Sequence, residues 1–145
     1  MREILFRGKS IKTQRWITGF LFKDEEGKTY MGYMKKERYY PDTRDWQAVE
    51  FYENNPVYTW VFVKEEVVPE TVGQYTGLND KNGVKIFEGD IVKYPEIIET
   101  LGTDRFEVVF AWGCFYISRD GLIGTLKTWN ESVEAIGNKY DNVEE

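Results

Sequence analysis

Hydrophobic and polar residues alternate over short stretches of the chain, and turn-forming residues separate these stretches. Two aromatic-rich runs between residues 15 and 34 flank an acidic turn that ends at Gly27, and this pattern predicts a β-hairpin. Residues 48–68 predict a second hairpin, interrupted at Asn54-Asn55-Pro56. Within it, residues 57–63 are apolar on both faces, which predicts a central strand that is covered on both sides.

The second half of the chain continues the same pattern. Residues 105–112 alternate cleanly and predict a strand with four side chains directed inward, namely Phe106, Val108, Phe110 and Trp112. Residues 114–118 and 132–140 predict further strands, and residues 95–104 predict a loop or a short helical turn. With about ten short strands between turn signals, the expected fold is mainly β with minor α, built from antiparallel strands.

The stretch "PETVGQYTGLNDKNGVKIFEGDIVKY", residues 69–94, is the densest cluster of turn residues and charge. Asn82-Gly83 predicts a type I′ turn, after which Lys85–Phe87 begins a new strand. Gly89 predicts a bulge or bend, Asp90 beside it is expected to accept bonds from backbone amides, and Asp80 is expected to open the Asn82-Gly83 turn. The residues assigned to this structural motif are Tyr75, Gly77, Asp80, Asn82, Gly83, Glu88, Gly89 and Asp90.

A charged run followed by Pro69 predicts a boundary between two packed halves. Residues 1–68 form the expected N-terminal β-hairpin half, and residues 69–145 the expected C-terminal half, a small β-barrel. The Gly-Asp pair before an apolar strand is similar to the entry into a strand of an SH3-like barrel, so we expect an SH3-like C-terminal half. That analogy concerns fold and carries no function.

Composition narrows the chemistry that this chain can perform. It contains no histidine and one cysteine, Cys114, which excludes Ser-His-Asp and Cys-His catalytic groups and zinc sites built from His or paired Cys. We therefore expect no enzyme activity, no cofactor and no metal. Carboxylates at Asp80, Glu88 and Asp90 could bind Ca²⁺ or Mg²⁺, but their spacing fits no EF-hand, and turn chemistry is the favoured interpretation.

Charge and hydropathy bear on location and partners. The net charge of −6 lowers the expectation of nucleic-acid binding, which normally needs a basic face. No apolar run is long enough to span a membrane, and a single cysteine suits a reducing compartment, so we expect a cytoplasmic protein. The one dense basic run precedes two tyrosines and gives a candidate binding surface: Lys35, Lys36, Arg38, Tyr39 and Tyr40.

Several segments carry a family likeness. "MREILFRGK" at the N-terminus, "RWITGFLF" over residues 15–22, "PETVGQYTGLNDKNGVKIFEGDIV" over residues 69–92 and "VEAIGNKYDN" over residues 133–142 resemble the YopX family. Its members are small proteins of phages and prophages of Gram-positive bacteria. Ala135 stands where the family more often has a larger apolar residue. The resemblance implies no assigned activity and no catalytic residues.

Two functional hypotheses remain. The first is a non-catalytic cytoplasmic interaction module that binds a protein partner or itself as a homo-oligomer, because excess aromatic residues, 17% of the chain, can anchor interfaces. The second is a nucleic-acid-binding accessory protein that uses a small β-barrel. Its stacking platform would consist of Tyr75, Tyr94, Trp112, Phe115 and Tyr116.

Overall fold

A computed structural model describes residues 3–141, which fold into two antiparallel sheets and three short α-helices. The first sheet has six strands in the order β4-β3-β2-β1-β5-β6. Its strands are β1 (Phe6–Lys9), β2 (Trp16–Lys23), β3 (Thr29–Arg38), β4 (Tyr58–Glu66), β5 (Gly73–Asn79) and β6 (Lys85–Phe87).

The second sheet has five strands in the order β10-β9-β8-β7-β11. Its strands are β7 (Asp90–Lys93), β8 (Arg105–Ala111), β9 (Cys114–Ser118), β10 (Leu122–Thr125) and β11 (Glu134–Asn138). The α-helices are α1 (Trp46–Asn54), α2 (Ile98–Leu101) and α3 (Leu126–Trp129), and 3₁₀ turns are η1 (Pro69–Thr71), η2 (Pro95–Ile97) and η3 (Asn130–Ser132). Strands hold 49% of the residues and helices 18%, which confirms the mainly β prediction.

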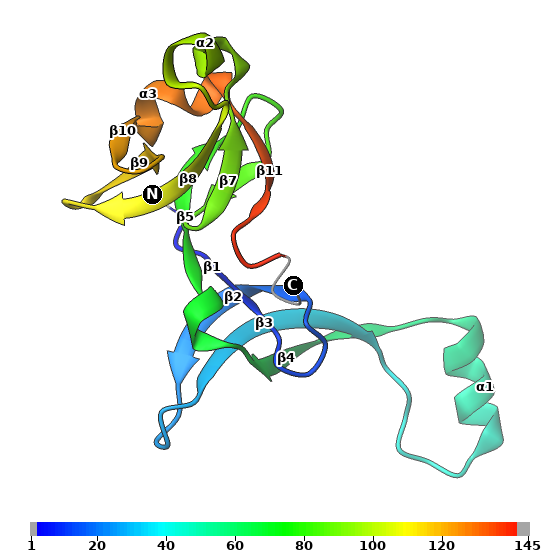
Figure 1. Ribbon diagram of the computed structural model, residues 1–145. Coiled ribbons are helices and arrows are strands. Elements are labelled where there is room, and N and C mark those ends of the chain that lie inside the picture. The colour runs from blue at the N-terminus through cyan, green and yellow to red at the C-terminus, as the bar shows by residue number, and fades with distance from the viewer. Residues whose placement is uncertain (1–2, 142–145) are drawn as a thin grey trace.

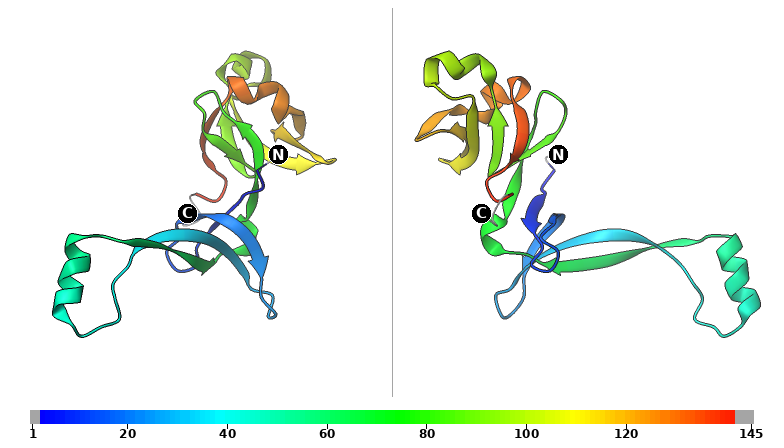
Figure 2. Two further views of the ribbon diagram at one scale, coloured as in Figure 1. Left: turned by 180° about the vertical axis from the view of Figure 1, so that it is seen from behind. Right: turned by 45° about the vertical axis from the view of Figure 1, so that its right-hand side comes forward.

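The molecule consists of a body and an arm (Figure 1). The body is the five-stranded sheet with α2 and α3 beside it. The arm, residues 29–66, is the long β3–β4 hairpin, which projects from the body and carries α1 at its tip. Figure 2 shows from two further sides that α1 lies far from the body. Within residues 3–141, no helix has the length and apolar character needed to cross a bilayer.

The hydrophobic core lies in the body. Its buried members come from β6, β7, β8, β9, α3 and the residue before β11: Ile86, Val92, Phe106, Val108, Ile117, Leu126 and Val133. The alternation of β8 explains its inner positions, because Phe106 and Val108 are buried as expected. The expected inward alternation ends there, since Phe110 is 54% exposed and Trp112 is 90% exposed at the end of the β8–β9 hairpin. The prediction for these two residues was therefore wrong.

The prediction of a covered central strand at residues 57–63 was also wrong. Residues 58–63 belong to β4, which within residues 3–141 pairs only with β3 and forms the edge of the six-stranded sheet. Tyr58, Trp60 and Phe62 are each more than half exposed. The pattern does give this strand two apolar faces, but the sequence does not reveal whether another part of the chain covers them.

The tip helix α1 replaces the first strand of the second predicted hairpin. Asp45 caps the helix, because its side chain accepts a bond from the Gln47 amide at 3.0 Å. Arg38 donates to the carbonyl oxygens of Tyr52, at 3.1 Å, and of Glu53 at the C-terminal end of the helix. The helix contains no buried residue. Local capping therefore defines α1, and it forms without a core contact.

The boundary expected at residue 69 coincides with η1, between β4 and β5. Both β5 and β6 lie beyond this boundary, yet β5 pairs with β1 of the first half in an antiparallel ladder. Ile86 of β6 also packs in the body core. The two sheets thus share the segment that follows η1, while the SH3-like character of residues 69–145 stays a prediction.

Candidate functional site

The turn after β5 is built around the carboxylate of Asp80, which is 6% exposed. Its Oδ1 accepts bonds from the amides of Asn82 and Val84 at 2.8 and 2.9 Å, and its Oδ2 accepts from the Ala135 amide at 2.8 Å. Asp80 therefore closes its own turn and also fixes the start of β11. The expected turn chemistry of this carboxylate is confirmed.

The type I′ geometry predicted for this turn was wrong. Gly83 has a φ of +81°, but Asn82 does not have the positive φ that a type I′ turn requires. The Gly83 amide instead donates to the Asp80 carbonyl at 3.0 Å, so Lys81 and Asn82 are the central residues of the turn. Gly83 follows them in the left-handed conformation and returns the chain to Lys85–Phe87, which forms β6 as predicted.

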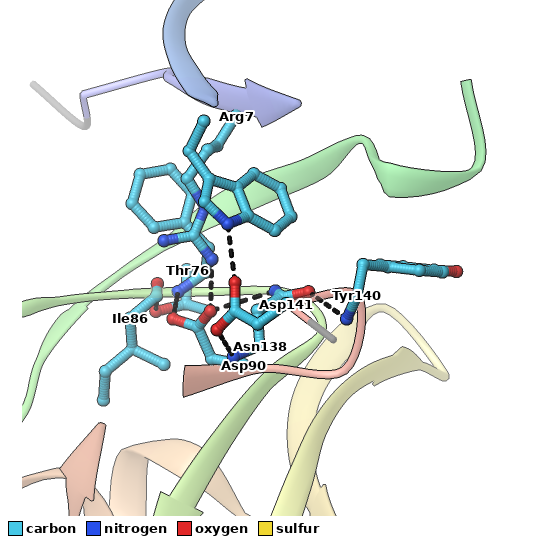
Figure 3. A network of polar contacts seen from close by, with 9 residues as sticks. Arg7, Thr76, Ile86, Asp90, Asn138, Tyr140 and Asp141 are labelled. Carbon is cyan, nitrogen blue, oxygen red and sulfur yellow. Dashed lines mark hydrogen bonds and ion pairs between the residues drawn. The ribbon is translucent and has the colours of Figure 1, made fainter. Parts of the chain in front are cut away.

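A second buried carboxylate, Asp90, is 3% exposed and lies at the start of β7. Its Oδ2 accepts from the Phe87 amide at 2.8 Å, and its Oδ1 accepts from Asn138 Nδ2 at 3.1 Å and forms an ion pair with Arg7 (Figure 3). The bond to the Phe87 amide confirms the expected turn chemistry. The ion pair adds a tie between β1 of one sheet and β7 of the other.

Aromatic rings surround this ion pair. The Arg7 guanidinium lies 4.6 Å from the Trp16 ring centroid and 4.4 Å from that of Phe87. Trp16 Nε1 donates to Asp141 Oδ1 at 2.7 Å, and the other oxygen of Asp141 accepts from the Asn138 amide at 2.7 Å. We call this group the joint: Arg7, Trp16, Phe87, Asp90, Asn138 and Asp141. It connects β1 and β2 to β7 and the end of β11.

Gly89 shapes the loop that presents Asp90. Its φ is +89°, and a Cβ at this position would lie 3.2 Å from Asn138 Nδ2. The glycine therefore provides both a left-handed backbone and close access to Asn138. This geometry confirms the expected bend before β7.

The remaining residues of the central motif serve β5 and its neighbours. Tyr75 is buried, its hydroxyl donates to Asn79 Oδ1 at 2.6 Å, and its ring packs on Phe87. Gly77 has a φ of +83° where the β5–β6 register shifts. Glu88 is half-buried, and no side-chain hydrogen bond of Glu88 occurs within residues 3–141.

This geometry assigns the carboxylates to folding. Every carboxylate oxygen of Asp80 and Asp90 accepts a hydrogen bond from a protein donor. Across the described residues, no three His, Cys, Asp or Glu side chains gather in an arrangement suited to a metal ion.

The predicted stacking platform does not assemble. Tyr75 is buried, Tyr94 packs against Trp129 at the edge of the core, and Phe115 packs against the core. Tyr116 is half-buried on β9, and only Trp112 is largely exposed. A stacking surface on the body would need several exposed rings, and this set supplies one.

Most side chains of the candidate binding surface at residues 35–40 make contacts within the arm. Lys35 pairs with Glu37 at 3.8 Å, and Arg38 holds the C-terminal end of α1 and lies over the Tyr40 ring. Tyr39 packs edge-on against Tyr52 of α1. Lys36 differs, because its ammonium group lies 4.9 Å from the centre of the exposed Tyr58 ring on β4.

Lys36 belongs to a larger surface that the sequence did not predict. In the β3–β4 register, Met34 lies opposite Phe62, Lys36 opposite Trp60, and Gly32 opposite Lys64. Directly opposed residues in antiparallel strands share a face, and Phe20 of β2 joins it opposite Gly32. We call these exposed side chains the aromatic face: Phe20, Met34, Tyr58, Trp60 and Phe62.

The aromatic face is large and carries positive charge. Its members are 51 to 64% exposed, and side chains on the order of 200 Å² each then leave roughly 600 Å² of accessible surface. That is the upper end for the largest apolar patch on a typical monomer. From Gly32 to Arg38 on β3 and from Tyr58 to Lys64 on β4, this face holds cations at Lys36, Arg38 and Lys64 and no carboxylate.

Comparison with known proteins identifies a shared fold and a family. The crystal structure of protein EF1440 from Enterococcus faecalis is similar over 99% of this chain and 98% of that one, with a TM-score of 0.54 and 20% sequence identity, which shows a shared fold. No match was found among curated proteins. The sequence description of the YopX protein family matches residues 6–144, so the chain belongs to the YopX family.

Proposed function

We propose that this protein is a non-catalytic cytoplasmic interaction module that binds a protein partner through its arm. The observation that carries this proposal is the aromatic face, whose exposed Trp60 and Phe62 lie on an edge strand far from the body core. Solvent does not favour such a surface, and large aromatic side chains are the usual anchors of protein interfaces.

The non-catalytic part of the proposal is supported by what the polar residues of the central motif do. Asp80 and Asp90 are the most deeply buried carboxylates there, and both are fully engaged in holding turns and strands. Arg7 forms an ion pair with Asp90. The two buried carboxylates of residues 69–94 therefore already have structural partners.

Photo-crosslinking tests the proposal. Trp60 is replaced by benzoylphenylalanine in the full chain, and the matched control carries the same residue at Phe110, which is 54% exposed on the body. Irradiated bacterial cells should yield protein adducts heavier than the 17.1 kDa chain from position 60 and few from position 110. Equal adduct yields from both positions, or none from position 60, would refute binding through the arm.

Single-stranded nucleic acid is a second candidate ligand, because aromatic rings lie beside Lys36 and Lys64 on the same face. Bases stack on such rings while cations contact the backbone. A mobility shift with oligonucleotides that weakens with salt and is lost in Lys36→Glu would favour this candidate. We rank it second, because the protein as a whole carries a charge of −6.

A further inference from the structure

The tip helix α1 receives little support from the rest of the fold. It has nine residues and none is buried, whereas isolated helices of fewer than about 12 residues are marginal in water. Trp46 is 69% exposed and Phe51 is 58% exposed. Tyr52 packs edge-on against Tyr39 and Phe51, so Trp46 and Phe51 remain largely exposed on a short helix.

Charge distinguishes the tip from the aromatic face. Residues 42–54 contain one cation, Arg44, and four carboxylates: Asp42, Asp45, Glu50 and Glu53. The aromatic face has the opposite character, since it presents Lys36 and Lys64. No salt bridge within residues 3–141 uses either lysine.

One arm therefore carries two complementary surfaces, an acidic and apolar helix and a basic and apolar sheet face. Within one chain α1 is tied only to the Arg38 end of this face and lies at the far end of the hairpin from Phe20 and Lys64 (Figure 1). Two arms laid antiparallel would bring each helix onto the other chain's face. This arrangement is a closed two-fold contact, the commonest symmetry of soluble oligomers.

We propose that the partner of the arm is a second copy of this chain, with α1 of each copy packed on the aromatic face of the other. This inference rests on the protein-binding function proposed above. Trp46 lies one turn from Glu50 on the same side of α1 and adds about 140 Å² to the roughly 600 Å² of the aromatic face, giving on the order of 740 Å² per subunit when all of it is buried. A standard stable interface takes about 800 Å² from each partner.

The first test is the mass of the purified full chain in solution. Sedimentation velocity and light scattering from about 1 to 100 µM, a range set by ordinary transient dimers, should show a species of twice the 17.1 kDa chain mass. Trp60→Ser should raise the dimer dissociation constant by about 30-fold, the size of a hot-spot effect. The control Phe110→Ser alters an equally exposed ring on the body and should leave the constant unchanged.

A charge-reversal exchange identifies the two surfaces in contact. Glu50→Lys with Glu53→Lys forms one variant, and Lys36→Glu with Lys64→Glu forms the other. Each variant alone places like charges opposite one another and should be monomeric. Mixing the two restores opposite charges at both contacts, so a mixed dimer should appear.

The outcomes separate this inference from the proposed function. A monomer at every concentration, with position 60 still crosslinking to a different protein, refutes self-association and keeps the protein-binding module. A dimer that is unchanged in Trp60→Ser and in both charge-reversal variants places the contact elsewhere and refutes this interface. Absence of both the dimer and any protein adduct refutes the two proposals together.

Discussion

Replacing Asp90 by Asn should show that the joint holds the two sheets together. The substitution keeps the shape of the side chain but removes its charge, so Arg7 on β1 loses its ionic partner on β7. The asparagine amide also lacks a second acceptor oxygen. Either the Phe87 amide or Asn138 Nδ2 would then lose its bond inside a buried site.

The expected loss follows from burial. The Asp90 side chain is 4% exposed and that of Arg7 is 19% exposed, so water replaces little of the lost interaction. Removing one partner of a buried pair costs about 3–5 kcal/mol. Because Arg7 keeps its contacts with the Trp16 and Phe87 rings, we expect the lower end, about 3 kcal/mol of unfolding free energy.

Urea unfolding followed by tryptophan fluorescence measures this loss by linear extrapolation. Glu88→Gln is the matched control, because Glu88 lies two residues away without a side-chain bond in the described chain, and its loss should stay within about 0.5 kcal/mol. Arg7→Met completes a double-mutant cycle. The unfolding free energy lost by the double variant should be smaller than the sum of the two single losses by at least about 1 kcal/mol.

Two results would refute this account of the joint. One is an Asp90→Asn protein as stable as the Glu88→Gln control. The other is strict additivity of Arg7→Met and Asp90→Asn, since independent effects would mean that the two charges do not interact.

Three further predictions concern separate parts of the fold. Gly83→Val should lower the unfolding free energy by about 1–2 kcal/mol and Gly83→Asn by less, because Gly83 has a φ of +81° with open space around it. Equal losses of the two variants in urea unfolding would contradict this reason. Asp45→Ala should speed hydrogen exchange at the backbone amide of Val49 in α1 by roughly fivefold, because the helix loses about 1 kcal/mol of capping energy. The urea midpoint of the whole protein should stay unchanged. An unchanged exchange rate would show that the cap does not stabilise α1. The Glu107 carboxylate, 3.0 Å from Lys139 Nζ, raises the pKa of Lys139, so the pair stabilises below the ordinary lysine pKa of about 10.4 and this contribution is lost as pH rises through the higher folded pKa. Lys139→Gln should therefore cost at most about 1 kcal/mol at pH 8 and nothing at strongly alkaline pH, and a loss that persists there would contradict the ionic origin.

The sequence predicted the features that depend on neighbours along the chain. The hairpin over residues 15–34, the left-handed Gly83, the bend at Gly89, the turn opened by Asp80 and the Asp90 bond to a nearby amide all arise from contacts within a few residues. Such signals are visible in a single sequence because the chemistry of the turn residue determines the backbone locally.

The features that escaped prediction depend on distant partners or on their absence. Arg7 and Asp90 are 83 residues apart, and no local pattern indicates that β1 and β7 meet. The helix α1 had one local signal, the capping residue Asp45, but its aromatic residues suit strands equally well. The strand over residues 57–63 was predicted to be covered, yet Trp60 is exposed. The hydrophobic pattern indicates which side chains are apolar but not which part of the chain, or which partner, covers them.

This last distinction bears directly on function. Exposing a strand that is apolar on both faces to water is unfavourable unless something covers it. Within residues 3–141, β4 is left uncovered on the side of Trp60 and Phe62. The joint has no such deficit, because its charges and amides all find partners within the chain. Selection for folding alone explains the joint but not the aromatic face. The unsatisfied surface is therefore where a partner is to be sought, although the central motif attracts attention first in the sequence.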